Sequence, residues 1–110
     1  MEVGHKNHYV EQMGKEKIIS ILEMMKPLLQ AEGVAHLDIF GSQARGDATP
    51  ESDLDILVEV LPEFKFSILN LVGVEHIVED AIGIHANAFM RRSLDEGFLH
   101  SISNDIVKVF

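Results

Sequence analysis

The chain has 110 residues, of which 46% are hydrophobic and 25% charged, so we expect one domain with a hydrophobic core rather than two. Its formal net charge is -9, from 18 acidic and 9 basic residues, which argues against a polynucleotide substrate because nucleic-acid interfaces gather Lys and Arg. The absence of cysteine excludes disulfides and thiolate metal sites, and no apolar run approaches the roughly 20 residues that span a bilayer, so no membrane segment is predicted.

The N-terminal residues lack hydrophobic periodicity. We predict a flexible arm over residues 1–10 and a single domain over residues 11–110. Polar and charged residues stand where a secretory signal would need an apolar stretch, so a cytoplasmic location is expected. His5 and His8 have the spacing of a metal clip, but without supporting carboxylates a solvated tail is the favoured interpretation.

Helical periodicity follows from about residue 11 to residue 31. One apolar face is made by side chains that recur at intervals of three and four residues: Ile18, Leu22, Met25 and Leu29. Pro27 removes a backbone donor, so it should kink this helix or restart it as a second short helix. Gly33 then provides a stop signal.

Two predicted strands come next, and the second carries the functional interpretation. Residues 36–40 form a strand that ends at Gly41 and Ser42. Residues 53–60 alternate in character, and the side chains expected to face the core are Leu54, Ile56, Val58 and Val60. Asp53 and Asp55 must therefore emerge together on the opposite face.

The remaining elements are a helix, a strand, a short helix and a terminal strand. The helix is predicted from apolar residues at helical spacing, and it ends at Gly83: Ile68, Leu71, Val74, Val78 and Ala81. The third strand is predicted over residues 84–89. A capping box of Ser93 and Glu96 is expected to start a short helix within residues 91–103, and residues 106–110 read as an edge strand.

Two segments together point to phosphoryl-transfer chemistry. Asp53 and Asp55 have side-chain bases about 6–7 Å apart on one strand face, so they can converge on one or two divalent cations, and oxygen ligands suit magnesium. Upstream, Gly41 lets the backbone approach a phosphate, and the Ser42 hydroxyl with the following amides can donate to phosphate oxygens. Read singly, an acidic pair is often a solvated strand edge and Gly-Ser is often a turn. Their combination is far more specific, because it supplies a phosphate cradle and a metal pair.

The runs Gly41-Ser42-Gln43-Ala44-Arg45-Gly46 and Ser52-Asp53-Leu54-Asp55-Ile56-Leu57-Val58 resemble the signature of the DNA polymerase beta-like nucleotidyltransferase superfamily, in its minimal single-domain (MNT) branch. The resemblance continues more loosely over residues 15–110. It implies an α/β (α+β) fold with a mixed central β-sheet flanked by helices. It also implies binding of a nucleoside triphosphate with Mg²⁺ and transfer of the nucleoside monophosphate to a hydroxyl.

The same resemblance implies roles for individual residues. Gly41 and Ser42 would bind the nucleotide, and Asp53 and Asp55 would hold the metal and serve catalysis. Arg45 stands where the signature often has arginine and could offset phosphate charge, although an ordinary exposed helix arginine is an equal alternative.

The sequence departs from the pattern at the third acidic residue, which the family carries on the next strand. There His85 and Asn87 share one strand face, and we expect His85 to take the place of the aspartate. His85 could act as a substitute base or ligand, or it could be tolerated in a degraded site. A slipped alignment would instead bring in Glu79 or Asp80 from the preceding helix.

Three functional hypotheses follow. The first is an enzyme that transfers a nucleotide, AMP by preference, from ATP with Mg²⁺ to a hydroxyl, for instance on a partner protein. The resemblance implies that this partner is a helical HEPN toxin protein and that the chain acts as its antitoxin. The second is a catalytically weakened binding module that neutralises a partner by contact. The third, a small-molecule modifier of the aminoglycoside-adenylating kind, fits the motif but not the length.

The short chain also leaves little protein to enclose a base and an acceptor. We therefore expect a homodimer or a complex with a helical partner, which would cover the apolar C-terminal stretch over residues 102–110. The alternative is that the last residues fold back into the chain's own sheet.

Overall fold

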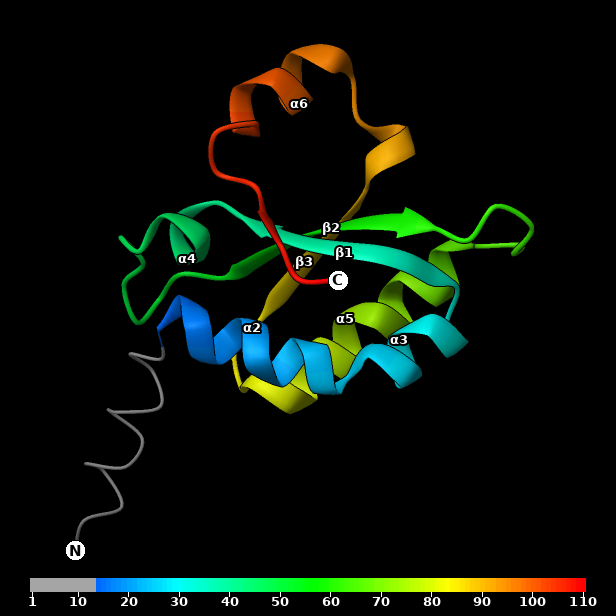
Figure 1. The fold of residues 1–110 in the computed structure, drawn as a ribbon, viewed down its shortest axis with the longest axis horizontal. Coiled ribbons are helices and arrows are strands. Elements are labelled where there is room, and N and C mark those ends of the chain that lie inside the picture. The colour runs from blue at the N-terminus through cyan, green and yellow to red at the C-terminus, as the bar shows by residue number, and fades with distance from the viewer. Residues whose placement is uncertain (1–13) are drawn as a thin grey trace, which may run out of the picture.

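The computed structural model describes residues 14–110, in which helices lie on both faces of a four-stranded sheet (Figure 1). The strand order is β3-β2-β1-β4, with bounds Ala86–Met90, Leu54–Val60, Val34–Phe40 and Val107–Lys108. Strand β1 is antiparallel to β2 and β4, whereas β2 and β3 are parallel. The expected mixed sheet flanked by helices is confirmed. The predicted arm over residues 1–10, the His5/His8 clip and the helix start at residue 11 lie outside the described residues.

The first helical pattern forms two helices, α2 (Lys15–Met24) and α3 (Lys26–Ala31). Pro27 lies in the first turn of α3, where its missing N–H has no helical partner to lose, so the chain restarts there as predicted. The apolar face of the pair is buried through Ile18, Leu22 and Leu29. The two helices therefore pack as a broken amphipathic unit against one face of the sheet (Figure 1).

Helix α5 (Ile68–Ile82) completes the layer on that face. The Ser67 hydroxyl caps its first turn, and Gly83 ends it in the left-handed region, which is the predicted stop. Val74 and Val78 are fully buried, whereas Ile68, the first member of the predicted apolar series, is 66% exposed. The pattern therefore identifies the helix correctly but overextends its buried face by one turn.

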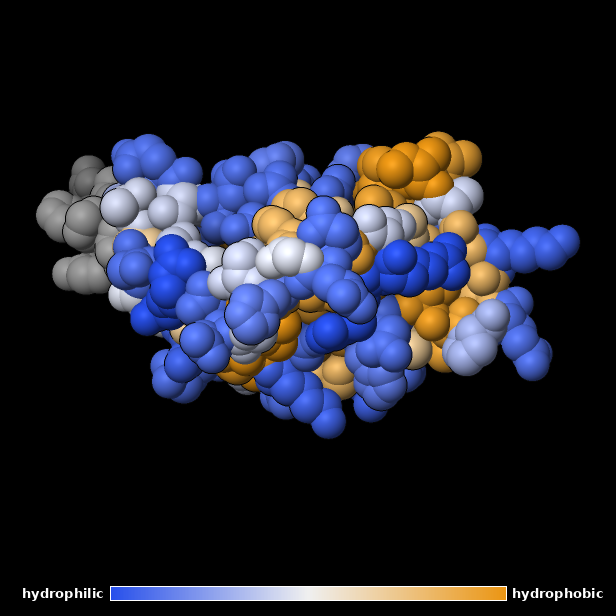
Figure 2. Space-filling view, turned by 90° about the horizontal axis from the view of Figure 1, so that it is seen from above, coloured by the Kyte–Doolittle hydropathy of each residue, from blue (hydrophilic) through white to orange (hydrophobic). Residues whose placement is uncertain are grey.

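A smaller layer covers the other face of the sheet. It consists of a 3-10 turn, η1 (Arg91–Ser93), and helix α6 (Glu96–Ile102), which lies above the sheet in Figure 1. The buried cluster beneath it is Phe40, Leu57 and Ile102. Figure 2 views this side from above and shows mainly polar side chains, with the largest apolar patch toward one end and smaller apolar areas between the polar residues.

The cap of α6 differs from the sequence-based prediction. The Asp95 carboxylate accepts a hydrogen bond from the Phe98 N–H at 2.8 Å, so Asp95 is the N-cap. The predicted capping box of Ser93 and Glu96 is wrong, because Ser93 belongs to the separate turn η1 and Glu96 is the first residue of the helix.

The C-terminal residues fold back into the chain's own sheet. Strand β4 pairs with β1 at Asp38 and Ile39, and Leu37 exchanges backbone hydrogen bonds with Val109 and Phe110. The alternative of a self-paired terminus is thus confirmed, and β4 is very short for an edge strand. Among the described residues no helix combines the length and the apolar character needed to span a membrane.

Candidate active site

Three strands meet at the end of the sheet where the sequence motifs lie. Phe40, the last residue of β1, pairs with Asp55 of β2, and Asp55 pairs with Asn87 of β3. Because β2 and β3 are parallel, their first residues lie at the same end, next to the point where β1 leaves the sheet. This register brings segments that are more than 30 residues apart in sequence into one cluster.

Gly41 adopts a backbone conformation that is open essentially to glycine alone, with φ 76° and ψ -157°. A Cβ placed on it would lie 2.6 Å from Oδ2 of Asp55, closer than two such atoms can approach. The residue therefore has to be glycine for two independent reasons, and the missing side chain is what lets the Asp55 carboxylate rest against the turn.

The turn leads into a single helical turn, α4 (Ser42–Arg45). The N–H groups of Ala44 and Arg45 bond to the Gly41 carbonyl, so the earlier N–H groups, of Ser42 and Gln43, have no acceptor within the helix. The buried Gln43 side chain donates to the Ser52 carbonyl at 3.4 Å. That bond ties α4 to the loop that immediately precedes Asp53.

Asp53 and Asp55 share one face, as strand alternation predicts. Nδ2 of Asn87 donates to Oδ2 of Asp53 at 3.1 Å and to Oδ1 of Asp55 at 3.2 Å. Asp53 is exposed and Asp55 is half-buried, so the pair lies at the surface rather than in a closed cavity. The two carboxylates converge on a single point, which the Asn87 amide group contacts.

Sequence reasoning placed His85 opposite the aspartates, and the structure places Asn87 there instead. His85 precedes β3, its side chain is 62% exposed, and its Nδ1 lies 2.6 Å from Oε2 of Glu79. The physical reason is the register, since Asp55 pairs with Asn87 and the backbone of His85 pairs only with Leu54. Strand parity, which puts residues 85 and 87 on one face, could not decide between them.

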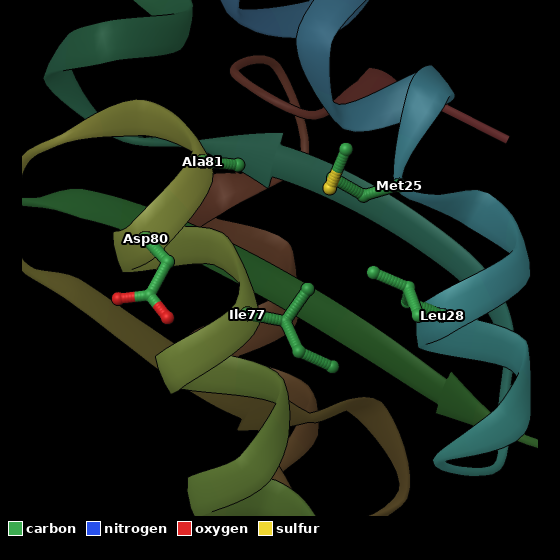
Figure 3. Close-up of a pocket in the computed structure, with 5 residues that line it drawn as sticks. All are labelled: Met25, Leu28, Ile77, Asp80 and Ala81. Atoms are coloured by element: carbon green, nitrogen blue, oxygen red, sulfur yellow. The ribbon is translucent and has the colours of Figure 1, made fainter.

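The two acidic residues considered as substitutes also lie away from this point. Glu79 accepts the Ala86 N–H at 2.9 Å on the outer side of β3, in addition to its contact with His85. Asp80 lines an apolar pocket between α3 and α5 together with Met25, Leu28, Ile77 and Ala81 (Figure 3). That pocket lies in the layer formed by α2, α3 and α5, called the helical layer below, on the face of the sheet opposite Asp55. Asp80 therefore cannot replace the missing carboxylate.

Arg45 is held by two carboxylates in this structure. Its Nε donates to Asp47 at 3.1 Å and its Nη1 donates to Asp105 at 3.0 Å. The hydrogen bonds that Arg45 donates to Asp47 and, with the smaller effect, to Asp105 raise the pKa of its guanidinium above the ordinary value. The side chain thus connects α4 with the segment after α6, and its predicted contact with nucleotide stays a prediction.

The two carboxylates offer oxygen ligands of the kind that hard divalent cations prefer. The positive end of an amide dipole already stands between them, at the point where a cation would balance their charge. Within residues 14–110 no group of three or more His, Asp or Glu side chains is arranged to hold a metal, so the carboxylate pair has no third charged ligand.

Comparisons with known proteins point to one family. Residues 15–108 match the family described as nucleotidyltransferase domain. The protein adenylyltransferase MntA of Thermococcus cleftensis is 35% identical, over 86% of this chain and 94% of that protein. A structure described as a minimal nucleotidyltransferase superposes with a TM-score of 0.73 at 25% identity, covering 86% of this chain and 95% of the other.

A more distant structure shares the fold. It contains the tri-AMPylated HEPN toxin of Shewanella oneidensis in complex with an MNT antitoxin, and it superposes with a TM-score of 0.56 at 15% identity. The match covers 91% of this chain and 71% of that chain.

Proposed function

The chain belongs to the nucleotidyltransferase domain family, and we propose that it transfers AMP from ATP, bound with Mg²⁺, to a hydroxyl group of a partner protein. The observation that carries this proposal is the packing of the Gly41 turn against Asp55, which supports a phosphate-binding turn beside the proposed metal ligands. A relative named as a protein adenylyltransferase supports AMP as the transferred group and a protein as the acceptor.

The charge of the site explains why a metal belongs to the reaction. The chain carries a net charge of -9, and the site presents Asp53 and Asp55 toward any incoming triphosphate. Arg45, the basic residue of the motif, is already paired with two carboxylates, those of Asp47 and Asp105. When bound, a divalent cation supplies the charge that lets phosphate oxygens approach these carboxylates and stabilises the developing charge during transfer.

Separate residues of the chain bind the triphosphate and the metal in this proposal. The Ser42 hydroxyl and the N–H groups of Ser42 and Gln43, which have no acceptor within α4, donate to oxygens of the triphosphate, and Gly41 leaves room for them. Asp53 and Asp55 would hold the metal. The acceptor oxygen forms a bond to the α-phosphorus, the bond from that phosphorus to the bridging oxygen breaks, and pyrophosphate leaves with the electron pair.

The proton of the acceptor hydroxyl also has to leave. For His85 to accept it, Nδ1 would have to give up its contact with Glu79, and its ring would have to turn from the outer edge of β3 toward the aspartates. Water therefore accepts the proton in this proposal, because the site opens to solvent at the exposed Asp53.

The proposed partner is a helical HEPN-type protein, toward which the chain acts as antitoxin. The MNT antitoxin of the Shewanella structure, which shares this fold, is in complex with such a toxin in AMPylated form. Large apolar side chains are exposed on the helical layer of this chain: Met24 69%, Leu28 56%, Ile68 66% and Leu69 78%. Exposed apolar side chains of this size are suited to contact with another protein.

The second candidate function is a binding module with weakened catalysis. It is favoured by one observation, the neutral Asn87 at the position opposite Asp55. In this case the chain would neutralise its partner by contact without modifying it.

Transfer of label separates the two functions. We expect the wild-type chain, incubated with Mg²⁺, α-labelled ATP and the HEPN-type partner, to label that partner. The double variant Asp53→Asn/Asp55→Asn should lose this by more than the roughly 10- to 100-fold typical of an outer-shell change, because it removes both charged ligands. Labelling that survives in the double variant contradicts the proposal, and a stable complex without labelling supports the binding module.

The matched control removes the same charge elsewhere. Glu63→Gln/Glu96→Gln neutralises two exposed carboxylates, one in the turn after β2 and one at the start of α6, outside both the aspartate cluster and the exposed apolar residues of α2, α3 and α5. It should label the partner at the wild-type rate. Light scattering of the chain alone and of the mixture distinguishes a homodimer from a complex with the partner.

A further inference from the structure

Asn87 contacts both aspartates of the site, although the sequence pattern does not single it out. We propose that Asn87 is the third ligand of a single divalent cation held by Asp53 and Asp55, and that its amide turns to present Oδ1 when the cation binds. This inference rests on the metal-dependent function proposed above and extends it to an uncharged residue.

The position of Asn87 is the first argument. It pairs directly with Asp55 across the parallel strands, and its amide nitrogen lies 3.1 Å and 3.2 Å from one oxygen of each aspartate. A group that reaches both carboxylates also reaches any cation that lies between them. No third His, Asp or Glu side chain within residues 14–110 joins the pair.

The chemistry of the amide is the second argument. An Asn side chain carries two N–H donors and an oxygen with two lone pairs, and rotation about its last bond exchanges them. Without a cation, the N–H₂ end faces the two carboxylates, as observed. With a cation in place, that end would meet positive charge, whereas the carbonyl oxygen is an accepted ligand of hard cations. The two aspartates then balance one divalent charge, and Asn87 adds a ligand without adding charge.

The backbone on either side of Asn87 is fixed, which is the third argument. The Ala86 N–H donates to Glu79 at 2.9 Å, and the Ala88 N–H donates to Glu75 at 2.8 Å. Both carboxylates come from α5 and hold the outer edge of β3. Strand β3 is therefore secured on both sides of the proposed ligand, so its side chain can turn without displacement of the backbone.

Direct metal binding tests the proposal without nucleotide or partner. Free Mn²⁺ is counted by electron paramagnetic resonance as it is added to the full chain. We expect one Mn²⁺ per wild-type chain, a dissociation constant at least tenfold higher in Asn87→Ala, and a lower one in Asn87→Asp, which restores an oxygen and adds charge. Asn104→Ala, the same change at an exposed turn, should bind as the wild type does.

The Mn²⁺ titration separates failure of the Asn87 ligand role from failure of the metal site itself. If Asn87 served only as a hydrogen-bond donor between the aspartates, its removal would free them, and Asn87→Ala would bind Mn²⁺ as tightly as the wild type or more tightly. Either result overturns the ligand role, as does a stoichiometry of two. If instead Asp53→Asn/Asp55→Asn binds Mn²⁺ like the wild type, the metal site of the proposed function itself fails. Thermal unfolding followed by circular dichroism checks that Asn87→Ala is folded.

Discussion

The two faces of strand β2 differ in what packs against them. On one face Leu54, Ile56 and Val58 are completely buried beneath α2, α3 and α5. On the other face Asp55 is half-buried beside the Gly41 turn, and further along the strand Leu57 is covered by the small α6 layer. Strand β2 thus contributes one set of side chains to the main hydrophobic core, whereas the alternate set includes Asp55 of the candidate active site.

This difference in packing indicates which face of the sheet can carry a functional site in so small a domain. The α6 face combines a three-residue buried cluster with half-buried neighbours and a Phe98 side chain that is 37% exposed. A face that is packed so incompletely leaves its strand ends open to ligands. The deeply packed face holds the same strand ends in place from behind.

The largest expected effect is the loss of unfolding free energy when a core side chain is truncated, and it should differ between the two faces of the sheet. Ile56→Ala should lower the free energy of unfolding by about 2–5 kcal/mol, because its side chain is wholly enclosed. Leu57→Ala should cost about 2 kcal/mol, the low end of that range, because its half-buried neighbours Phe89 and Leu99 can move into the space. Denaturant unfolding followed by circular dichroism measures both. An equal or larger loss in Leu57→Ala would mean that the two faces contribute alike.

A second prediction addresses the turn that joins the site to the sheet. Gly41→Ala should cost about 1–3 kcal/mol of stability through its backbone conformation, and it should also weaken Mn²⁺ binding because the new Cβ displaces the Asp55 carboxylate. Chemical unfolding and Mn²⁺ titration measure the two effects.

Gly46→Ala is the matched control for that prediction. Gly46 also has a positive φ, of 88°, but a Cβ there would have no neighbour within 4 Å. It should lose about 1–2 kcal/mol of stability and keep the wild-type affinity for Mn²⁺. If Gly41→Ala also keeps that affinity, the contact with Asp55 does not matter for the site.

The smallest expected effect concerns the thin α6 layer. Asp95→Ala removes the N-cap bond to the Phe98 N–H and should lower stability by about 1 kcal/mol. Ser93→Ala should change stability by less than about 0.5 kcal/mol, because Ser93 makes no cap bond in the structure. Thermal unfolding of both variants measures the two losses of stability. A larger loss in Ser93→Ala than in Asp95→Ala would support the capping box that the sequence predicts.

The sequence by itself determined the elements and the shared face of the aspartates. Alternation along residues 53–60 decides on which side Asp53 and Asp55 emerge, because the side-chain period of a strand is two. Pro27 and Gly83 marked a helix start and a helix end through backbone constraints that act locally. The motif around Gly41 pointed to the family for the same reason, since its glycine is required by local geometry.

Tertiary structure alone decided which residue stands opposite the aspartates. His85 and Asn87 have the same strand parity, so the choice depends on how β3 is registered against β2, and register is a property of two segments rather than one. The engagement of Arg45 with Asp105 joins residues 60 positions apart, and the carboxylates of α5 that secure β3 depend on how the helix packs. Local patterns cannot encode such contacts, because each needs the folded chain to bring its two partners together.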